Sequence, residues 1–259
     1  MNFLPTTKSV KRTSDPRNLI LFGLPKVGKT TALSKLPNAL ILDLEDGTDY
    51  IEGAYVIKIK SYVDMYKAAK ALREEQHGFK FVIIDTVTAL EEISLNLACK
   101  RYKESIMGKN WDGNGNDILK LPQGGGYYWL RIAMQEIIGW FTDQSYNLIL
   151  TGHVKERNMV EGGTELVVKN LDLGGKMANI LAAKSDGIAY LYRDVDTGAL
   201  MANFGDMNAI LTGSRVSHLA GKTIQLAERR LNDKEEWELT THWDKIYPSL
   251  ITDGTTEEA

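Results

Sequence analysis

The chain of 259 residues has little of what disulfides, metal clusters and membranes require. Cys99 is the only cysteine, which excludes an internal disulfide and a cysteine metal cluster. The four histidines include no H-x-x-x-H pair, so we do not expect a structural zinc site. No apolar run approaches the roughly 18 residues that span a bilayer, and the first residues lack the apolar stretch of a secretory signal. We therefore expect a cytoplasmic protein without a membrane partner.

The chain also lacks a strong charge of either sign. Lysine and arginine number 31 against 34 acidic residues, a formal net charge of −3. This balance argues neither for nor against nucleic acid as a partner, because counterion release depends on local basic grooves. The hydrophobic share of 43% is enough for a proper core. The length suits one large α/β domain or a core domain with a small appendage.

Short apolar runs that end at glycine or polar residues alternate with helical segments. The runs are Asn18–Phe22, Ala39–Leu42, Phe81–Ile84 and Asn147–Thr151, with a weaker one at Val56–Ile59. Helices are predicted after a cap at Ser61 as far as about Glu75, over Ala89–Tyr102 and over Tyr127–Phe141. Such alternation predicts a parallel sheet covered on both faces. Ligands of these sheets bind at the carboxyl ends of the strands.

The remaining segments predict one domain with mobile ends. Residues 1–17 are interpreted as a flexible N-terminal arm, 18–251 as the domain and 252–259 as a disordered acidic tail. Gly187–Arg193 and Leu200–Phe204 predict a hairpin around Asp196–Gly198. Met107–Gly126 and Lys155–Gly163 are predicted to be loops. A charged stretch with Lys222, Arg229 and Arg230 is interpreted as a solvated helix face.

The segment GLPKVGKT, from Gly23 to Thr30, fits the pattern G-x-x-x-x-G-K-[ST] between a predicted strand and a predicted helix. Its glycines let backbone N–H groups wrap a phosphate, and the following helix adds its positive end. We expect Lys29 to reach the β and γ phosphates and the Thr30 hydroxyl to bind Mg²⁺. We assign nucleotide binding to the whole run: Gly23, Leu24, Pro25, Lys26, Val27, Gly28, Lys29, Thr30 and Thr31.

Two carboxylates follow neighbouring apolar strands. Asp85 ends the run FVIID, and in enzymes with such a phosphate loop this acid holds the magnesium, directly or through water. Glu45 lies two residues beyond Asp43, where it would deprotonate a water that attacks the γ-phosphate. The plainer alternatives are an Asp that starts a turn and a solvated acidic turn over residues 43–49.

GLPKVGKTT, LILDLED, FVIIDTVTAL and NLILTGHVKER occur in an order and spacing that resembles the RecA core. The resemblance implies a RecA-like P-loop NTPase, an α/β fold whose mostly parallel central sheet has helices on both faces, here with a C-terminal β-hairpin region. It implies Glu45 as the catalytic base, acting with Lys29. His153 stands where RecA proteins place a polar residue, usually Gln, that senses the γ-phosphate. An imidazole can also donate to phosphate, so His153 joins the nucleotide site.

The chain is most similar to short phage nucleotide-binding proteins, some of which resemble single-strand annealing recombinases. The segment LPQGGGYYWLRIAMQEIIGWF looks like theirs. The resemblance implies ATP and Mg²⁺, hydrolysis to ADP and phosphate that DNA stimulates, and single-stranded DNA as partner. It also implies a ring or filament of identical subunits, and a single-strand binding or other phage recombination protein as a further partner. In such assemblies cations of the next subunit complete each site; Lys184 and Arg193 are candidates for this role, but an ordinary surface position is the default interpretation.

RecA-like proteins contact single-stranded DNA through two loops, which correspond here to Met107–Gly126 and Lys155 to about Lys176. Cations and an aromatic side chain in these segments suit a site that tracks the backbone and stacks on bases. The residues are Lys109, Trp111, Lys120, Lys155, Arg157, Lys169 and Lys176. Taken singly, each is equally consistent with an ordinary solvated loop.

Two other functions stay open. A nucleotide-dependent scaffold would recruit a replication or recombination protein without strong turnover. A small-molecule kinase would use the same phosphate loop, but it would not need Glu45, and no arginine-dense lid is evident. The N-K-x-D signature of GTPases is absent, which favours ATP over GTP.

Overall fold

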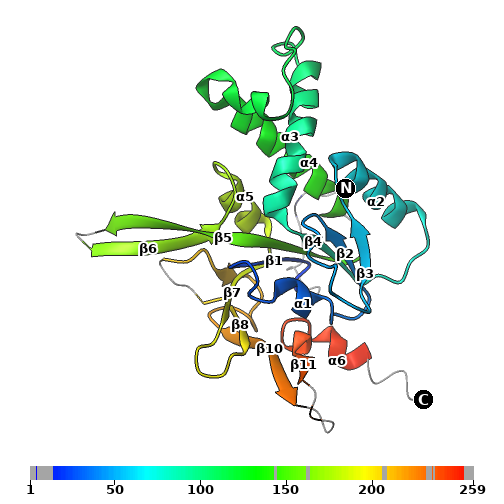
Figure 1. Ribbon diagram of the computed structural model, residues 1–259, viewed down its shortest axis with the longest axis vertical. Helices are drawn as coiled ribbons and strands as arrows, with labels where there is room; N and C mark the ends of the chain where they lie inside the picture. Colours follow the sequence, from blue (N-terminus) through cyan, green and yellow to red (C-terminus); the bar gives the residue numbers. More distant parts are fainter. Residues whose placement is uncertain are drawn as a thin grey trace.

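The computed structural model describes residues 4, 14–142, 145–161, 164–205, 209–231, 235 and 237–253 (Figure 1). The strands are β1 (Asn18–Gly23), β2 (Ala39–Asp43), β3 (Tyr55–Lys58), β4 (Phe81–Asp85), β5 (Asn147–Glu161), β6 (Thr164–Leu171), β7 (Gly187–Arg193), β8 (Leu200–Asn203), β9 (Gly213–Ser214), β10 (Thr223–Leu231) and β11 (Trp237–Thr241). The helices are α1 (Lys29–Leu33), α2 (Tyr62–Glu74), α3 (Val87–Glu104), α4 (Gly125–Thr142), α5 (Met177–Lys184) and α6 (Ser249–Asp253), with 3₁₀ turns η1 (Gly115–Lys120), η2 (Pro122–Gly124) and η3 (Trp243–Lys245).

The strands form one mixed sheet in the order β11-β10-β8-β7-β1-β5-β4-β2-β3, with β6 paired to β5 and β9 paired to β7. The block from β7 to β3 is parallel, and β8, β10 and β11 extend it in antiparallel fashion. β5 therefore lies between β1, which leads into the phosphate loop, and β4, which ends at Asp85. The predicted α/β fold with a mostly parallel sheet is confirmed.

Each face of the sheet carries its own apolar core, because successive side chains of a strand point to opposite sides. Ile20 and Phe22 of β1 enter a core that α2, α3, α4 and α5 cover. Leu19 and Leu21 enter a second core under α1 and the C-terminal segment. There the indole N–H of Trp243 donates to the carbonyl of Ala32 at 2.9 Å, which fixes the C-terminal segment to α1.

Local capping sets the starts of two helices that border the site. Ser61 accepts a hydrogen bond from the backbone N–H of Asp64 at 3.3 Å, as the predicted cap of α2 requires. Thr86 accepts one from Ala89 at 3.2 Å and so caps α3 directly after β4. The side chain that follows Asp85 therefore helps to begin the helix that leaves the site.

Several predicted segments differ in the structure. The predicted loop from Lys155 is a β-hairpin. β5 continues to Glu161, and its residues from Val154 to Glu161 pair with the whole of β6. The stretch with Arg229 and Arg230 is strand β10 rather than a helix face, and Lys222 precedes that strand. The predicted loop Met107–Gly126 contains η1 and η2, and α4 begins at Gly125. Hairpin β7–β8 is confirmed.

The chain ends contact the domain where they are described. Asp15 accepts hydrogen bonds from the backbone and the hydroxyl of Ser249, and the backbone N–H groups of Arg17 and Asn18 donate to Asp186 at 2.9 Å. The rest of the expected arm, residues 1–3 and 5–13, and residues 254–259 of the expected tail lie outside the described residues. Among the described helices, none is both long and apolar enough to cross a bilayer.

Candidate nucleotide-binding site

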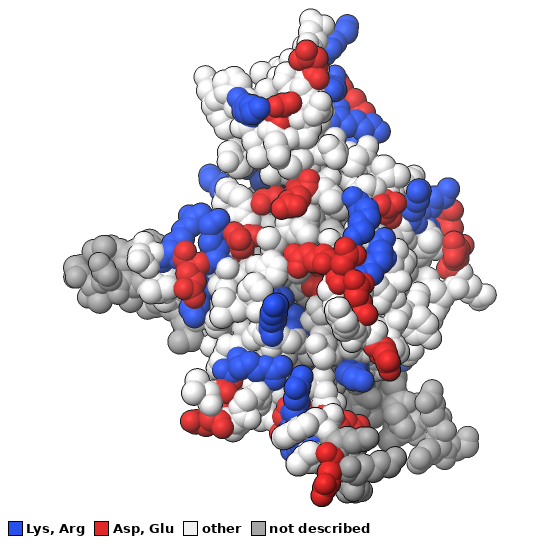
Figure 2. All heavy atoms as spheres, viewed as in Figure 1, with Lys and Arg blue, Asp and Glu red and all other residues white. Residues whose placement is uncertain are grey.

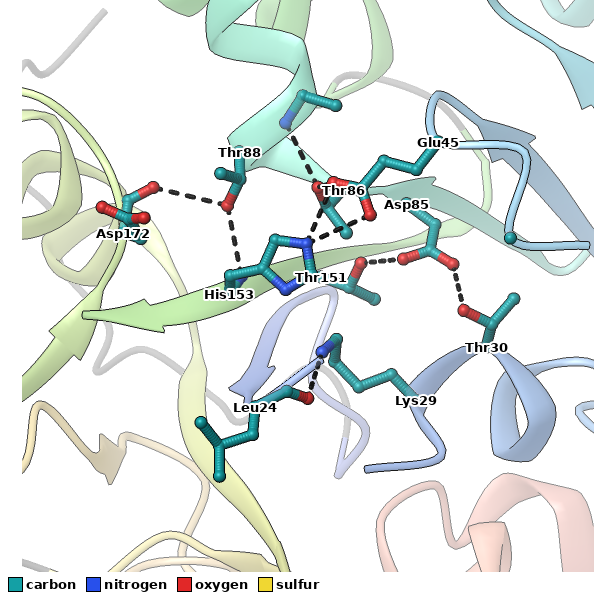
Figure 3. Close-up of polar contacts among 12 residues, drawn as sticks. Leu24, Lys29, Thr30, Glu45, Asp85, Thr86, Thr88, Thr151, His153 and Asp172 are labelled. Carbon is teal, nitrogen blue, oxygen red and sulfur yellow. Dashed lines mark hydrogen bonds and ion pairs between the residues drawn. The ribbon is translucent and has the colours of Figure 1, made fainter. Parts of the chain in front are cut away.

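The carboxyl ends of β1, β2 and β4, with the middle of β5, bring the predicted site residues together (Figure 3). Gly23 at the end of β1 pairs with His153 of β5 on one side and with Leu191 of β7 on the other. Asp43 at the end of β2 pairs with Asp85 at the end of β4. Segments more than one hundred residues apart in the chain thus meet at one edge of the sheet.

The phosphate loop takes a backbone path that its glycines make possible. A β-carbon on Gly23 would lie 2.4 Å from the carbonyl oxygen of Leu191, so this close approach to β7 requires glycine. Gly28 has a backbone φ of 111°, in a region that residues with a side chain rarely adopt. Leu24, Pro25 and Lys26 are exposed at the top of the loop, Val27 is buried, and Thr31 is exposed on α1. The loop therefore presents its backbone to the solvent side of the strand ends.

The Lys29 side chain is buried inside the loop that it follows. Its Nζ donates to the carbonyls of Gly23 at 3.1 Å and of Leu24 at 3.0 Å. Burial lowers the pKa of Lys29, and the carboxylates of Asp85 and Glu45 oppose that shift. The ammonium group of Lys29 and the carboxylate of Asp85 are thus both buried, with the charge of Glu45 close by.

Asp85 and Thr30 form an oxygen-rich pair at the floor of the site. The Thr30 hydroxyl donates to Asp85 Oδ2 at 2.6 Å, and the Thr151 hydroxyl from β5 donates to Oδ1. Burial raises the pKa of Asp85, opposed by both hydroxyl groups and by Lys29. No cluster of three or more metal-binding side chains occurs among the described residues. One carboxylate with one hydroxyl nevertheless fits Mg²⁺, which takes oxygen ligands and keeps places for water and phosphates.

Glu45 lies opposite the phosphate loop, held by two donors. The Thr86 hydroxyl donates to Oε1 at 2.6 Å. His153 Nε2 lies 3.0 Å from Oε1 and 3.1 Å from Oε2. The Glu45 side chain is 36% exposed, so water reaches it.

Asp43 shapes the turn that carries Glu45. Its buried carboxylate accepts hydrogen bonds from the backbone of Glu45, Gly47 and Thr48, from the Thr48 hydroxyl, and from Lys58 Nζ at 2.8 Å. Burial alone would raise the pKa of Asp43, but these donors lower it to about 2. Asp43 is therefore an ionised anchor that fixes the position of its neighbour two residues on.

His153 connects the site to the hairpin. Its backbone N–H donates to the Thr88 hydroxyl at 3.1 Å, and that hydroxyl donates to the Asp172 carbonyl at 3.3 Å. The backbone N–H of Asp172 returns a bond to the His153 carbonyl at 2.9 Å. His153 Nδ1 is buried and has no partner among the described residues, so the tautomer protonated at Nε2 suits the contact with Glu45.

Arg193 contacts the phosphate loop of its own chain. Its Nε donates to the carbonyl of Val27 at 2.9 Å, and a β-carbon on Gly28 would lie 2.5 Å from one of its terminal nitrogens. Burial lowers the pKa of Arg193, and the nearby Arg229 lowers it further. The expectation that Arg193 serves a neighbouring subunit is therefore not needed to explain its position. Lys184 bonds to Gln135 at 3.0 Å.

The hairpin divides the predicted DNA-contacting cations between its two faces. Lys155 pairs with Asn170 and Arg157 with Val168, so both cations share one face, and they line a groove of about 180 Å³. Lys169 faces the other way, 4.9 Å from the ring centroid of Tyr190. Figure 2 shows basic and acidic side chains gathered at the base of this hairpin. Lys169 therefore lies apart from the other two cations.

The other predicted nucleic-acid residues are more scattered. Lys109 and Trp111 follow the end of α3, and Lys120 ends η1, which packs beside α3 through the contact of Gly115 with Cys99. Figure 1 shows the outer end of α3 away from the β5–β6 hairpin. Trp111 packs edge-to-face with Tyr102, and Lys120 pairs with Asp117 at 2.7 Å. Lys176 is exposed just before α5, close in sequence to the hairpin's end. The structure thus groups only some of the seven residues.

Sequence reasoning missed the hydroxyl groups that complete the site, and it considered Arg193 only for the site of a neighbouring subunit. Thr86, Thr88 and Thr151 hold Glu45, His153 and Asp85, and Arg193 braces the loop. Thr86 follows Asp85 directly and Thr88 comes two residues after Thr86, so their position was a usable signal. Thr151 and Arg193 carried no local signal, because their partners come from distant segments.

The fold and this geometry define a RecA-like P-loop nucleotide-binding domain. The chain belongs to the AAA_24 family of AAA domains, which it matches over residues 15–230. It is also 24% identical over 117 residues to the SPbeta prophage-derived uncharacterized protein YorG of Bacillus subtilis (strain 168). That match spans 44% of this chain and 36% of YorG, so the chain matches only about a third of this relative's length.

Two solved structures are loosely similar. The RadB recombinase matches at 12% identity with a TM-score of 0.44, over 85% of this chain and 90% of that one. The flagellar accessory protein FlaH of Methanocaldococcus jannaschii matches at 11% identity with a TM-score of 0.41, over 89% and 91%.

Proposed function

We propose that the protein hydrolyses ATP and couples hydrolysis to the binding of single-stranded DNA. The observation that supports this best is the position of Glu45, a water-accessible carboxylate beside the phosphate loop. His153 connects it to the base of the β5–β6 hairpin, where Lys155 and Arg157 line a groove. A carboxylate at this place has a use in hydrolysis, whereas nucleotide binding alone does not need it.

In the hydrolytic step, Lys29 and the loop backbone would hold the phosphates, and Glu45 would orient a water in line with the γ-phosphorus. Glu45 takes one proton of that water, and the oxygen of the water bonds to the γ-phosphorus. The bond between the γ-phosphorus and the β–γ bridging oxygen breaks. ADP and phosphate are the products. Thr30 and Asp85 would hold Mg²⁺, which neutralises charge on the phosphates when bound.

The contact between His153 and Glu45 restrains the base in the state described here. Both carboxylate oxygens lie within 3.1 Å of Nε2, and Oε1 also accepts from Thr86, so few lone pairs remain for a water. A γ-phosphate that draws Nε2 away would release Glu45, because an imidazole N–H donates to either anion. His153 would then act as the phosphate sensor.

The route from His153 to the nucleic acid runs through Thr88 and Asp172. Thr88 bonds to the His153 backbone and to the Asp172 carbonyl, and Lys155 in the basic groove pairs with the Asp172 carboxylate at 3.0 Å. A DNA phosphate that competes for Lys155 would loosen this pair and shift the loop. Such a change reaches Glu45 without any large movement of the sheet.

Steady-state hydrolysis of ATP, measured with and without single-stranded DNA at low salt, tests the proposal. We expect the rate to rise with DNA and the rise to shrink as salt is added, since the contacts are electrostatic. An absence of hydrolysis under both conditions would contradict the enzymatic assignment, and a rate that DNA does not change would contradict the coupling.

The second candidate is a nucleotide-dependent scaffold for a recombination or replication protein. The exposed apolar pair Ile106 and Met107, at 98% and 84% exposure, favours it, because it projects at the end of α3. Retained ATP binding together with hydrolysis that ignores DNA would favour this function. A ring or filament of identical subunits is compatible with either candidate, and sedimentation with and without ATP tests for it.

A further inference from the structure

A second cavity lies beside the basic groove, between α3, α4 and the start of α5. Its volume is about 260 Å³. The buried side chains of Leu130 and Met134 form its floor. The exposed Tyr127 and Lys176 lie at its rim, with Glu91 and Arg131 between floor and rim. An apolar floor with a few polar groups around it is typical of a small-ligand site.

Glu91 supplies the cavity with an acceptor. Its Oε1 accepts the backbone N–H of Gly174 at 2.8 Å, while Oε2 has no hydrogen-bond partner among the described residues. Burial raises the pKa of this carboxyl group, opposed by the Gly174 bond. The half-buried acid therefore holds the loop before α5 with one oxygen and keeps the other available for a donor.

Aromatic and cationic groups border the same opening. Tyr127 is 50% exposed, and Arg131 lies over the Tyr128 ring, 5.4 Å from its centroid. Among the described residues Arg131 has no acidic partner. Of these groups, the Tyr127 ring and the Arg131 guanidinium line the cavity, and such flat groups suit a planar ligand that enters on edge.

The cavity adjoins the groove of the proposed DNA site. Gly175 lines both, and Lys155 and Arg157 line only the groove. A strand whose phosphates follow these two cations would therefore bring a base to the cavity mouth. Among the sugar, phosphate and base groups of a nucleic acid strand, only the base is planar and apolar enough to fit the floor of the cavity.

We infer that this cavity receives one unstacked nucleobase of the bound single strand, with Tyr127 against its face and Glu91 accepting an N–H from its edge. The inference rests on the proposed function, since it needs a strand in the groove. Every nucleobase carries at least one such N–H group, so the site takes bases in general. A free nucleotide is a weaker fit, because its phosphates would lie away from Lys155 and Arg157.

The occupied cavity would also be sensed at the nucleotide site. Gly174, which Glu91 holds, is two residues from Asp172, and Asp172 bonds to Thr88. A base that donates a hydrogen bond to Glu91 therefore acts on the segment from Asp172 to Gly174, which Thr88 connects to His153 and so to Glu45. This places the recognition of a base and the control of hydrolysis on one short segment.

Fluorescence anisotropy of the full chain, with a non-hydrolysable ATP analogue at low salt, tests the inference. Two labelled strands are compared, an oligothymidylate and an abasic strand of equal length. We expect the wild type to bind the base-bearing strand more tightly, and Tyr127→Ala to reduce that preference about tenfold while binding the abasic strand unchanged. Tyr127→Phe should keep the preference, and Glu91→Gln should reduce it less than Tyr127→Ala does.

Tyr55→Ala is the matched control, because Tyr55 is also exposed but lies on the edge strand β3, away from the cavity. Equal wild-type affinity for the two strands would overturn the inference and leave DNA binding intact. A Tyr127→Ala variant that loses both strands equally would overturn it too, because the effect would not depend on bases. Binding of neither strand would overturn this inference and the proposed DNA binding together.

Discussion

The nucleotide site and the hairpin face are two polar regions joined at His153, and they are built in opposite ways. At the nucleotide site, Lys29, Asp43 and Asp85 are 6%, 1% and 4% exposed and their polar atoms are paired. On the hairpin face, Lys155 is 43% exposed and Arg157 is exposed as well. Fixed, desolvated groups suit chemistry on phosphates, since they need no reorganisation. Exposed cations suit a nucleic acid strand that binds reversibly and dissociates as the salt concentration rises.

Substitutions are expected to have larger effects at the nucleotide site than on the hairpin face. Loss of one buried charge leaves its partners unpaired and costs more than the pair itself contributed. Loss of one exposed cation costs a single phosphate contact. We therefore expect a near-complete loss of ATP binding for substitutions in the phosphate loop, and small losses of DNA binding for substitutions on the hairpin.

Lys29→Ala should have the largest effect. Truncation removes the buried ammonium group that Asp85 and Glu45 face, so ATP affinity should fall by about a thousandfold. Titration with a fluorescent ATP analogue measures it. Lys35→Ala, an exposed lysine just beyond α1, is the control and should bind as the wild type does. Retained affinity in Lys29→Ala would remove the phosphate-loop assignment.

Glu45→Gln should separate binding from turnover. The amide cannot take the proton of water, so kcat should fall by about a hundredfold or more while ATP binding is retained. Phosphate release and nucleotide titration are measured on the same preparation. Glu52→Gln changes an exposed acid nearby and should leave both quantities unaltered. An unchanged kcat in Glu45→Gln would show that another group is the base.

Asp43→Asn should destabilise the fold in a pH-dependent way. The folded-state pKa of about 2 lies below the unfolded value near 3.8, so the ionised group contributes stability at neutral pH. We expect about 1 to 2 kcal/mol, reduced by water around the partly exposed Lys58. Urea unfolding should show the wild-type advantage above about pH 4 and its loss as pH falls towards 2. A difference constant over that range would contradict the ionised anchor.

Thr88→Val tests whether the two regions are connected. Valine keeps the shape but removes the hydroxyl between His153 and Asp172, so the stimulation by DNA should fall about fivefold. Hydrolysis and DNA affinity are measured side by side, and ATP affinity should be retained. Thr142→Val changes an exposed threonine at the end of α4 and should keep the full stimulation. Undiminished stimulation in Thr88→Val would exclude this route.

Arg157→Ala should have the smallest effect. We expect about threefold weaker binding of single-stranded DNA and a salt slope smaller by about 0.7, as for one lost phosphate contact. Lys169→Ala on the opposite hairpin face is the matched control, because Lys169 is held by Tyr190 and Glu156. Equal losses in the two variants would show that the faces are not distinguished.

The parallel strands and helices were predictable because each carries its own pattern. The apolar runs of β1, β2, β4 and β5 are buried, and a run of this kind has few alternatives. The β5–β6 hairpin was missed because Lys155 to Asn158, where the hairpin begins, are all polar and exposed and give no apolar alternation. The same reason hid β10, whose last residues Arg229 to Leu231 are charged or exposed although they pair with β11.

The chain by itself determined the phosphate loop, since the turn of Gly23 to Thr30 depends on glycines and a lysine within one short segment. It also placed Glu45 and Asp85 at strand ends, because each follows its own apolar run. Only the tertiary structure brought His153 to Glu45, 108 residues away, and set Arg193 on Val27. These contacts depend on strand order, with β5 between β1 and β4 and β7 beside β1. Local sequence does not encode that order, because strand pairing is decided by the packing of the whole sheet.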